Sequence, residues 1–67
     1  MTVAEVLMKR KSAGIRQDVL ALSLKWNRET LIDIERGRVE VSEHTLRQIN
    51  SAIDQIERQK QGEEVMA

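Results

Sequence analysis

Apolar residues recur every three or four positions along the chain, and short polar or glycine-containing breaks divide this pattern into four segments. The segments cover residues 3–13, 17–24, 28–36 and roughly 43–60. Such a period is typical of helices that bury one face and expose the other. The pattern therefore predicts an all-α domain, with one helix in each segment and the longest helix last.

The predicted helix ends coincide with residues that favour caps and stops. Thr2 and Glu5 have the spacing of a capping box, in which the threonine accepts from a helical N–H and the glutamate reaches back to the cap. The other candidates are Asn27 and Ser42 as N-caps, and Gly14 and Gly37 as left-handed stops. Residues 25–27 break the pattern, so we expect two short helices on either side of them.

The second and third helices have differently composed faces. Leu20, Ala21 and Leu24 share one face of the second helix, where the small Ala21 permits close approach of another helix. Leu31 and Ile34 share one face of the third helix, and the opposite face carries Glu29, Ile32, Asp33 and Arg36. We expect one face of the third helix to pack and the other to meet a partner.

Arg10 falls on the apolar stripe of the first helix. An unpaired cation there would cost on the order of 3 to 5 kcal/mol, so it needs an anionic partner from another segment. Glu35 stands in the last turn of the third helix, where its charge opposes the helix dipole, and it also needs a partner. We expect Arg10 and Glu35 to form a structural ion pair.

The last helix carries one apolar stripe of Leu46, Ile49, Ile53 and Ile56. Leu46 and Ile49 are expected in the core of the domain. Ile53 and Ile56 lie further along, and we expect them to meet their twofold equivalents in a dimer. The alternative is that they complete the core of the protomer. Residues 61–67 are expected to form a flexible C-terminal tail.

Size and composition narrow the classes of protein. The 67 residues make one small domain, with no room for a second, sensing domain. The chain has no cysteine, no glycine-rich phosphate loop and one histidine, His44, so we expect no enzyme, no metal site and no cofactor. No long apolar run indicates a signal peptide or a membrane span. We expect a soluble, intracellular protein without a small-molecule ligand.

Charge is unevenly distributed along the chain, although the formal net charge is zero. Residues 9–38 hold eight cations and four acids, which gives +4, whereas residues 39–67 hold three cations and six acids, which gives −3. The first part could face a polyanion and the second a partner or solvent. A chance division of solvated surface charges explains the same numbers, so charge alone does not decide.

The segment from Ile15 to Ile53 resembles the Cro/CI-type (XRE-like) helix-turn-helix domains of phage repressors and their bacterial relatives. The resemblance rests on residues that stand together in register: Gln17, Leu20-Ala21, Leu24, Thr30-Leu31, Ile34-Glu35, Gly37, Ser42, Thr45-Leu46 and Ile49. It implies a compact bundle of four to five helices of the lambda-repressor-like type, with the helix-turn-helix domain at residues 1–60. The family also pairs an arginine of the first helix with the glutamate before the glycine, which matches Arg10 and Glu35.

The same resemblance implies that the third helix lies in the major groove of DNA and that the second helix crosses the backbone. Base edges in that groove offer donors as well as acceptors, so both arginines and carboxylates can read them. The expected base-reading residues are Asn27, Arg28, Glu29, Ile32 and Asp33. Arg28 would read guanine, Glu29 would read cytosine or orient Arg28, and Ile32 would meet a thymine methyl group. The alternative for Glu29 and Asp33 is surface ion pairing with Arg28 and Arg36.

Phosphate contacts form a separate group, because they position a protein on DNA without reading its sequence. The expected phosphate-binding residues are Arg16, Gln17, Lys25, Arg36 and Arg38, with Lys9 and Lys11 as further candidates on the first helix. Gln17 combines an amide with the positive end of the second helix, which is an arrangement that suits anions.

Some positions depart from the family pattern. Lys25 stands where the family often has glycine, and Arg16 where it often has a serine or threonine cap. Val19 and Leu22 are apolar where the family is usually polar, so they pack on the last helix, form an extra contact or are ordinary exposed apolar residues. Trp26 occupies an apolar position of the family and is expected to fill the core between the second and third helices.

Together these features predict a small dimeric transcriptional repressor, often autoregulatory, that binds a pseudo-palindromic operator in double-stranded DNA. The short repressors that it resembles are encoded by phages, mobile elements and bacteria, and they act in the cytoplasm. Activation in place of repression fits the same features. The main alternative is a protein-binding module, such as an antitoxin that holds a toxin with Val19, Leu22 and Val41. A structural helical dimer without a DNA role is a more remote alternative.

Overall fold

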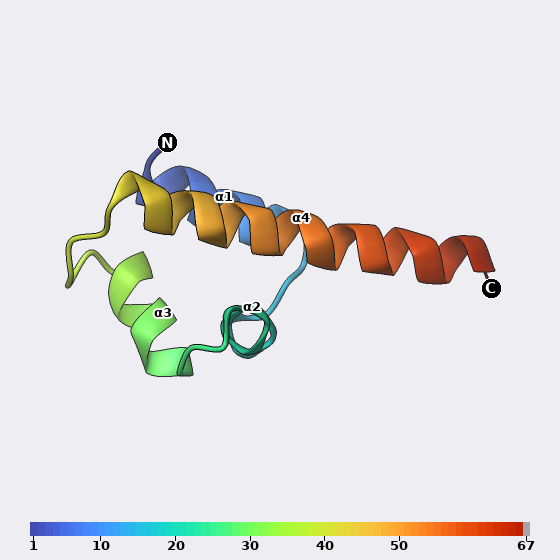
Figure 1. The fold of residues 1–67 in the computed structure, drawn as a ribbon, viewed down its shortest axis with the longest axis horizontal. Coiled ribbons are helices and arrows are strands. Elements are labelled where there is room, and N and C mark those ends of the chain that lie inside the picture. Colours follow the sequence, from blue (N-terminus) through green and yellow to red (C-terminus); the bar gives the residue numbers. More distant parts are fainter. Residues whose placement is uncertain (67) are drawn as a thin grey trace.

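Four helices make up the part of the chain that the computed structural model describes, which is the backbone of residues 1–66 and the side chains of residues 1–60. They are α1 (Val3–Ser12), α2 (Gln17–Leu24), α3 (Arg28–Glu35) and α4 (Glu43–Met66). The predicted all-α bundle with an extended last helix is confirmed. Helix α4 packs against α1 and α2, and α3 packs against the same two helices. Figure 1 shows α2 end-on, below the middle of α4, with α3 beside it.

Two of the predicted N-caps make the expected hydrogen bond. Thr2 Oγ1 accepts from the Glu5 N–H at 3.2 Å, and Ser42 Oγ accepts from the Thr45 N–H at 3.1 Å. The Glu5 carboxylate contacts the Thr2 hydroxyl. Asn27 occupies the N-cap position of α3, but its side chain makes no capping hydrogen bond, so that part of the prediction is wrong.

Helices α1, α2 and α3 end in the same backbone turn. In each, a residue with positive φ donates its N–H to the carbonyl three positions earlier, and the next N–H reaches the carbonyl five positions earlier. This is the Schellman motif, which favours glycine at the positive-φ position. Gly14 and Gly37 fill that position after α1 and α3, whereas Lys25, with φ of 61°, fills it after α2. The break that the sequence pattern predicted is therefore a left-handed turn at a lysine.

One core joins all four helices. Its buried apolar members are Val6, Ile15, Leu20, Ala21, Leu31, Ile34, Leu46, Ile49, Ala52 and Ile53. Trp26 is partly buried against this core, as predicted. The most completely enclosed side chains come from α2, α3 and α4, so the core lies where these helices meet.

The structure corrects the expected role of Ile53 at a dimer seam. Its side chain is 0% exposed within the single chain, so it cannot meet a second copy, and Ile56 is partly buried against the same core. For Ile53 the structure supports the alternative, in which the residue completes the core of the protomer, whereas Ile56 keeps some exposed surface and its place at a dimer seam stays a prediction. Helices α1 and α2 both pack against α4, and the core that they share with it extends as far as Ile53.

Helix α4 continues through Gly62 to Met66, past the end that was predicted near Lys60. Figure 1 shows its second half extending beyond the other helices. The side chains of the predicted tail, residues 61–67, lie outside the described residues. In the described part of the chain, no helix combines the length and apolar composition that a membrane span requires.

Candidate nucleic-acid interface

An open groove of about 400 Å³ lies where the end of α1 meets the starts of α2 and α3, and its lining is mostly cationic. The lining residues are Arg10, Lys11, Arg16, Gln17, Asp18 and Arg28. The one acid, Asp18, is 3.3 Å from Arg16, which leaves the groove with excess positive charge. Three separate segments of the chain thus converge on a surface that suits an anion.

Arg10 and Glu35 meet beneath this groove. Arg10 Nε donates to Glu35 Oε2 at 2.7 Å, and Arg10 Nη2 donates to Glu35 Oε1 at 3.1 Å. Arg10 Nη1 also donates to the Ile15 carbonyl at 2.8 Å, so the guanidinium is satisfied although it is only 7% exposed. The pair ties α1 to the end of α3. Because α3 is held from behind, the direction of its outer face is fixed.

Gln17 belongs to the same network. Its Nε2 donates to Glu35 Oε1 at 2.8 Å, which joins the start of α2 to the end of α3. The amide was expected to bind phosphate, and this contact leaves one of its two N–H groups for that purpose. In the described part of the chain, every buried side-chain nitrogen or oxygen has a hydrogen-bond partner.

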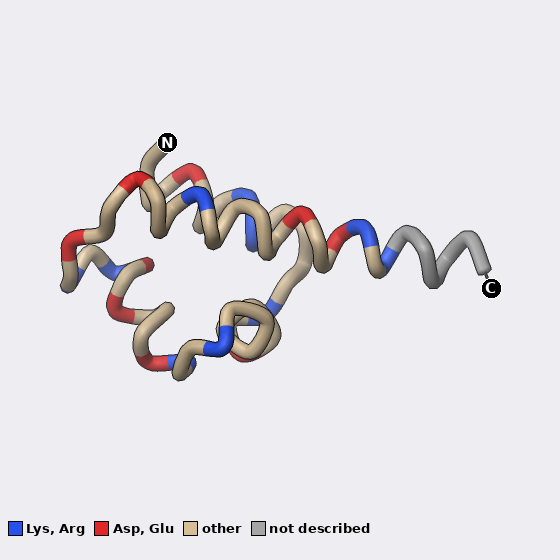
Figure 2. Tube along the Cα trace, in the orientation of Figure 1, with Lys and Arg blue, Asp and Glu red and all other residues tan. Residues whose placement is uncertain are grey.

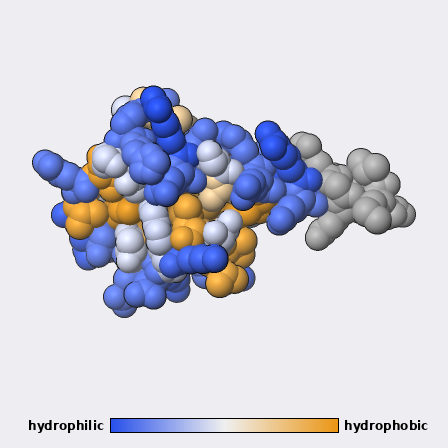
Figure 3. All heavy atoms as spheres, in the orientation of Figure 1, coloured by the Kyte–Doolittle hydropathy of each residue, from blue (hydrophilic) through white to orange (hydrophobic). Residues whose placement is uncertain are grey.

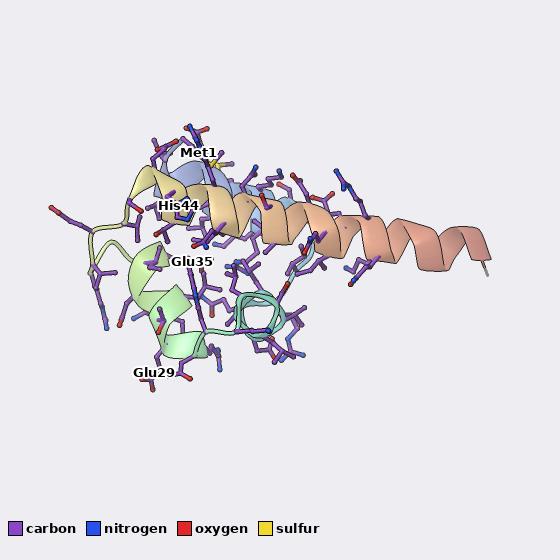
Figure 4. The ribbon with its side chains drawn as sticks, in the orientation of Figure 1. Met1, Glu29, Glu35 and His44 are labelled. Carbon is purple, nitrogen blue, oxygen red and sulfur yellow. The ribbon has the colours of Figure 1, made fainter. Side chains whose placement is uncertain are left out.

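The outer face of α3 presents most of the predicted base-reading residues together. Asn27, Arg28 and Glu29 are exposed, and Ile32 and Asp33 are partly exposed. Figure 4 shows Glu29 at the outer end of α3, pointing away from the body of the molecule, and Glu35 on the inner side of the helix. Since the Asn27 side chain is not used as a cap, its amide is available to a partner.

The two acids of this face differ in their surroundings. Asp33 Oδ1 lies 3.5 Å from Arg38 Nη1. The alternative to base reading was an ion pair with Arg36, so the partner named in that alternative is wrong. For Glu29 the described residues provide no ion pair. Glu29 therefore offers a free acceptor beside Arg28, while Asp33 already has a cation.

Most of the cations predicted to bind phosphate flank α3 at the surface. Arg16, Lys25, Arg36 and Arg38 are all exposed, and Figure 2 shows the cations and acids along the chain. Arg16 and Arg38 each contact a neighbouring acid.

The two lysines of α1 have different environments. Lys9 lies 2.6 Å from Asp54 and 2.7 Å from Asn50 Oδ1 on α4, so it fastens two helices together and is a poor candidate for phosphate. Lys11 lines the cationic groove. The helical period shows which face of α1 each lysine occupies, but not which face packs on α4. The sequence alone therefore could not tell that Lys9 binds α4 and that Lys11 lines the groove.

Apolar side chains are exposed on α2, away from the core. Leu22 is 78% exposed and Val19 is 43% exposed, so both side chains offer apolar surface to solvent or a partner. Val41, in contrast, is partly buried against the core. Figure 3 shows apolar surface among hydrophilic side chains on the face that it presents. Among the described residues, no group of His, Asp or Glu side chains is arranged to hold a metal ion.

Comparison with known protein families matches residues 6–60 to a helix-turn-helix family. That span runs from the middle of α1 to the part of α4 beyond the core, so it includes the cationic groove and the outer face of α3. Comparison with curated proteins and comparison with solved structures returned no match.

Proposed function

Because the chain belongs to the helix-turn-helix family of the Cro/CI type, which consists of DNA-binding regulatory domains, we propose that it is a dimeric transcriptional repressor. It binds a pseudo-palindromic operator with α3 in the major groove. The observation that carries this proposal is the outer face of α3, where Arg28 and Glu29 stand exposed beside the cationic groove.

The arrangement of charges supports docking on duplex DNA. Arg28 can donate to guanine O6 and N7, Glu29 can accept from cytosine N4, and Ile32 can meet a thymine methyl group. We assign the phosphate contacts on either side of the major groove to exposed cations, which are Arg16, Lys25, Arg36 and Arg38. Glu29 would thus add selectivity, and the surrounding cations would offset the repulsion of the acids by the DNA backbone.

Dimerisation is proposed from the size of the reading surface. One short helix contacts only a few base pairs, and proteins of this class gain affinity by pairing so that two recognition helices enter the groove about one turn apart. The seam does not include Ile53, which the protomer buries. We place this activity in the bacterial cytoplasm, on DNA of a bacterium, phage or mobile element.

Random-sequence selection tests the proposal. The protein is incubated with a pool of random duplexes, and the bound fraction is amplified and sequenced. We expect an inverted repeat with half-sites about one helical turn apart, and binding that weakens steeply as salt is raised. Enrichment of no sequence, or binding that is insensitive to salt, would contradict a sequence-specific regulator.

A second candidate function rests on the exposed apolar side chains of α2. Leu22 and Val19 could hold a protein partner, as in an antitoxin whose helix-turn-helix domain binds a toxin. Gel shifts on DNA upstream of the gene discriminate between the two. Sequence-selective, salt-sensitive retardation by the protein alone favours the repressor, whereas retardation that requires Leu22 and a second protein favours the antitoxin.

A further inference from the structure

The turn after α3 has a charged residue where the turns after α1 and α2 have an apolar one. In a Schellman motif the residue after the positive-φ position is brought back over the helix, and an apolar contact usually fills the space. After α1 that residue is Ile15, which is buried, and after α2 it is Trp26, which packs against the core. After α3 it is Arg38, whose side chain is 61% exposed.

Two contacts bring Arg38 next to Asp33. The Arg38 N–H donates to the Asp33 carbonyl at 2.9 Å, and Arg38 Nη1 lies 3.5 Å from Asp33 Oδ1. The ion pair stands where the other two turns have an apolar contact. The backbone turn therefore brings Arg38 next to Asp33, and Gly37 makes this turn possible with its φ of 74°.

Glu29 lies about one turn earlier on the same face, and the described residues provide it with no cation. An unpaired carboxylate near phosphates is repelled unless it accepts a donor from a base, which cytosine N4 supplies. A carboxylate already paired with arginine has no such need. The guanidinium of Arg38 has five N–H groups, so it can hold Asp33 and still donate to a phosphate oxygen.

We propose that Asp33 is a positioning residue that holds Arg38 for a phosphate contact, and that Glu29 is the carboxylate that reads the half-site. This assignment rests on the proposed binding of α3 in the major groove. It divides the outer face of α3 into a reading part near Asn27 and a phosphate-clamping part near Gly37.

The test uses the full chain and the duplex enriched by random-sequence selection. Affinity is measured for that duplex and for every single base-pair variant of one half-site, over a series of salt concentrations. The proteins are the wild type, Glu29→Gln, Asp33→Asn, Arg38→Gln and the Asp33→Asn, Arg38→Gln double variant. Glu40→Gln, alone and with Arg38→Gln, is the matched control because it removes one exposed acid from the loop that follows α3.

We expect Glu29→Gln to lose roughly tenfold discrimination at one base pair, and Asp33→Asn to keep the wild-type preference at every position. Arg38→Gln should lower the salt slope by about one in the wild-type background. In the Asp33→Asn background it should lower the slope much less, because Arg38 has already lost its position. With Glu40→Gln the effect of Arg38→Gln should remain complete.

Relaxed preference at a base pair in Asp33→Asn would overturn the assignment, and so would equal effects of Arg38→Gln in all three backgrounds. A reduced effect of Arg38→Gln with Glu40→Gln as well would show that general charge removal, not positioning, is responsible. In each of these results the wild type still selects its operator, so the proposed function stands. If the wild type selects no sequence, the proposed function fails and this assignment fails with it.

Discussion

Replacing Lys25 by glycine is expected to stabilise the domain by about 0.5 to 1 kcal/mol. Lys25 has φ of 61° and ψ of 35° at the end of α2, a left-handed conformation in which a Cβ costs roughly 1 to 2 kcal/mol. Glycine removes this cost, but it destabilises the folded state by roughly 0.5 to 1 kcal/mol because it loses more conformational freedom on folding. The turn itself survives, since its bonds, Lys25 N–H to Leu22 and Trp26 N–H to Ala21, are made by the backbone.

Thermal unfolding followed by circular dichroism measures the effect. A gain of this size should raise the Tm by roughly 2 to 8 °C in a domain of this length. Lys25→Ala is the control, because it removes the same charge and keeps the Cβ, and it should bring no stabilisation. A glycine variant that melts at or below the alanine variant would show that the left-handed conformation of Lys25 does not cost the domain stability. Both variants should bind operator DNA with a salt slope lower by about one if Lys25 contacts a phosphate.

Three further predictions concern the ion pair, the core and the reading face. Glu35→Gln should destabilise the domain by about 3 to 5 kcal/mol in urea unfolding, because it leaves Arg10 buried without a counter-charge; a loss below about 1 kcal/mol would mean that the pair is only a surface contact. Ile53→Ala should cost about 2 to 5 kcal/mol and Ile56→Ala clearly less, and the opposite order in thermal melts would contradict the burial described above. Arg28→Ala should weaken binding to the selected duplex by about 1 to 3 kcal/mol and relax preference at one base pair, whereas equal losses on selected and random DNA would remove Arg28 from the reading residues.

Helix positions could be predicted from the sequence because their causes are local. The apolar period, the Thr2 and Ser42 caps and the glycines after α1 and α3 each act within a few residues. The end of α4 was predicted too early because Gly62 was read as a stop signal. One glycine inside a helix costs only about 1 kcal/mol, which is too little for Gly62 to end the helix.

The wrong predictions at the site concern tertiary packing, which cannot be deduced from the apolar period of the sequence. The stripe of α4 identified Ile53 as apolar but did not show whether a second copy or the protomer itself buries it, and the packed helices show that the protomer does. Likewise, spacing along the helix offered Arg36 as a partner for Asp33. The backbone turn at Gly37 brings Arg38 there instead. The pairing of Arg10 with Glu35 was accessible because each residue alone is unfavourable in its predicted place.

A crystal structure of the protein bound to its selected duplex would show directly whether α3 reads the DNA. We expect α3 in the major groove, with Arg28 and Glu29 within hydrogen-bond distance of base edges and Arg38 at a phosphate. A complex in which α3 faces solvent and another surface contacts the DNA would contradict this expectation.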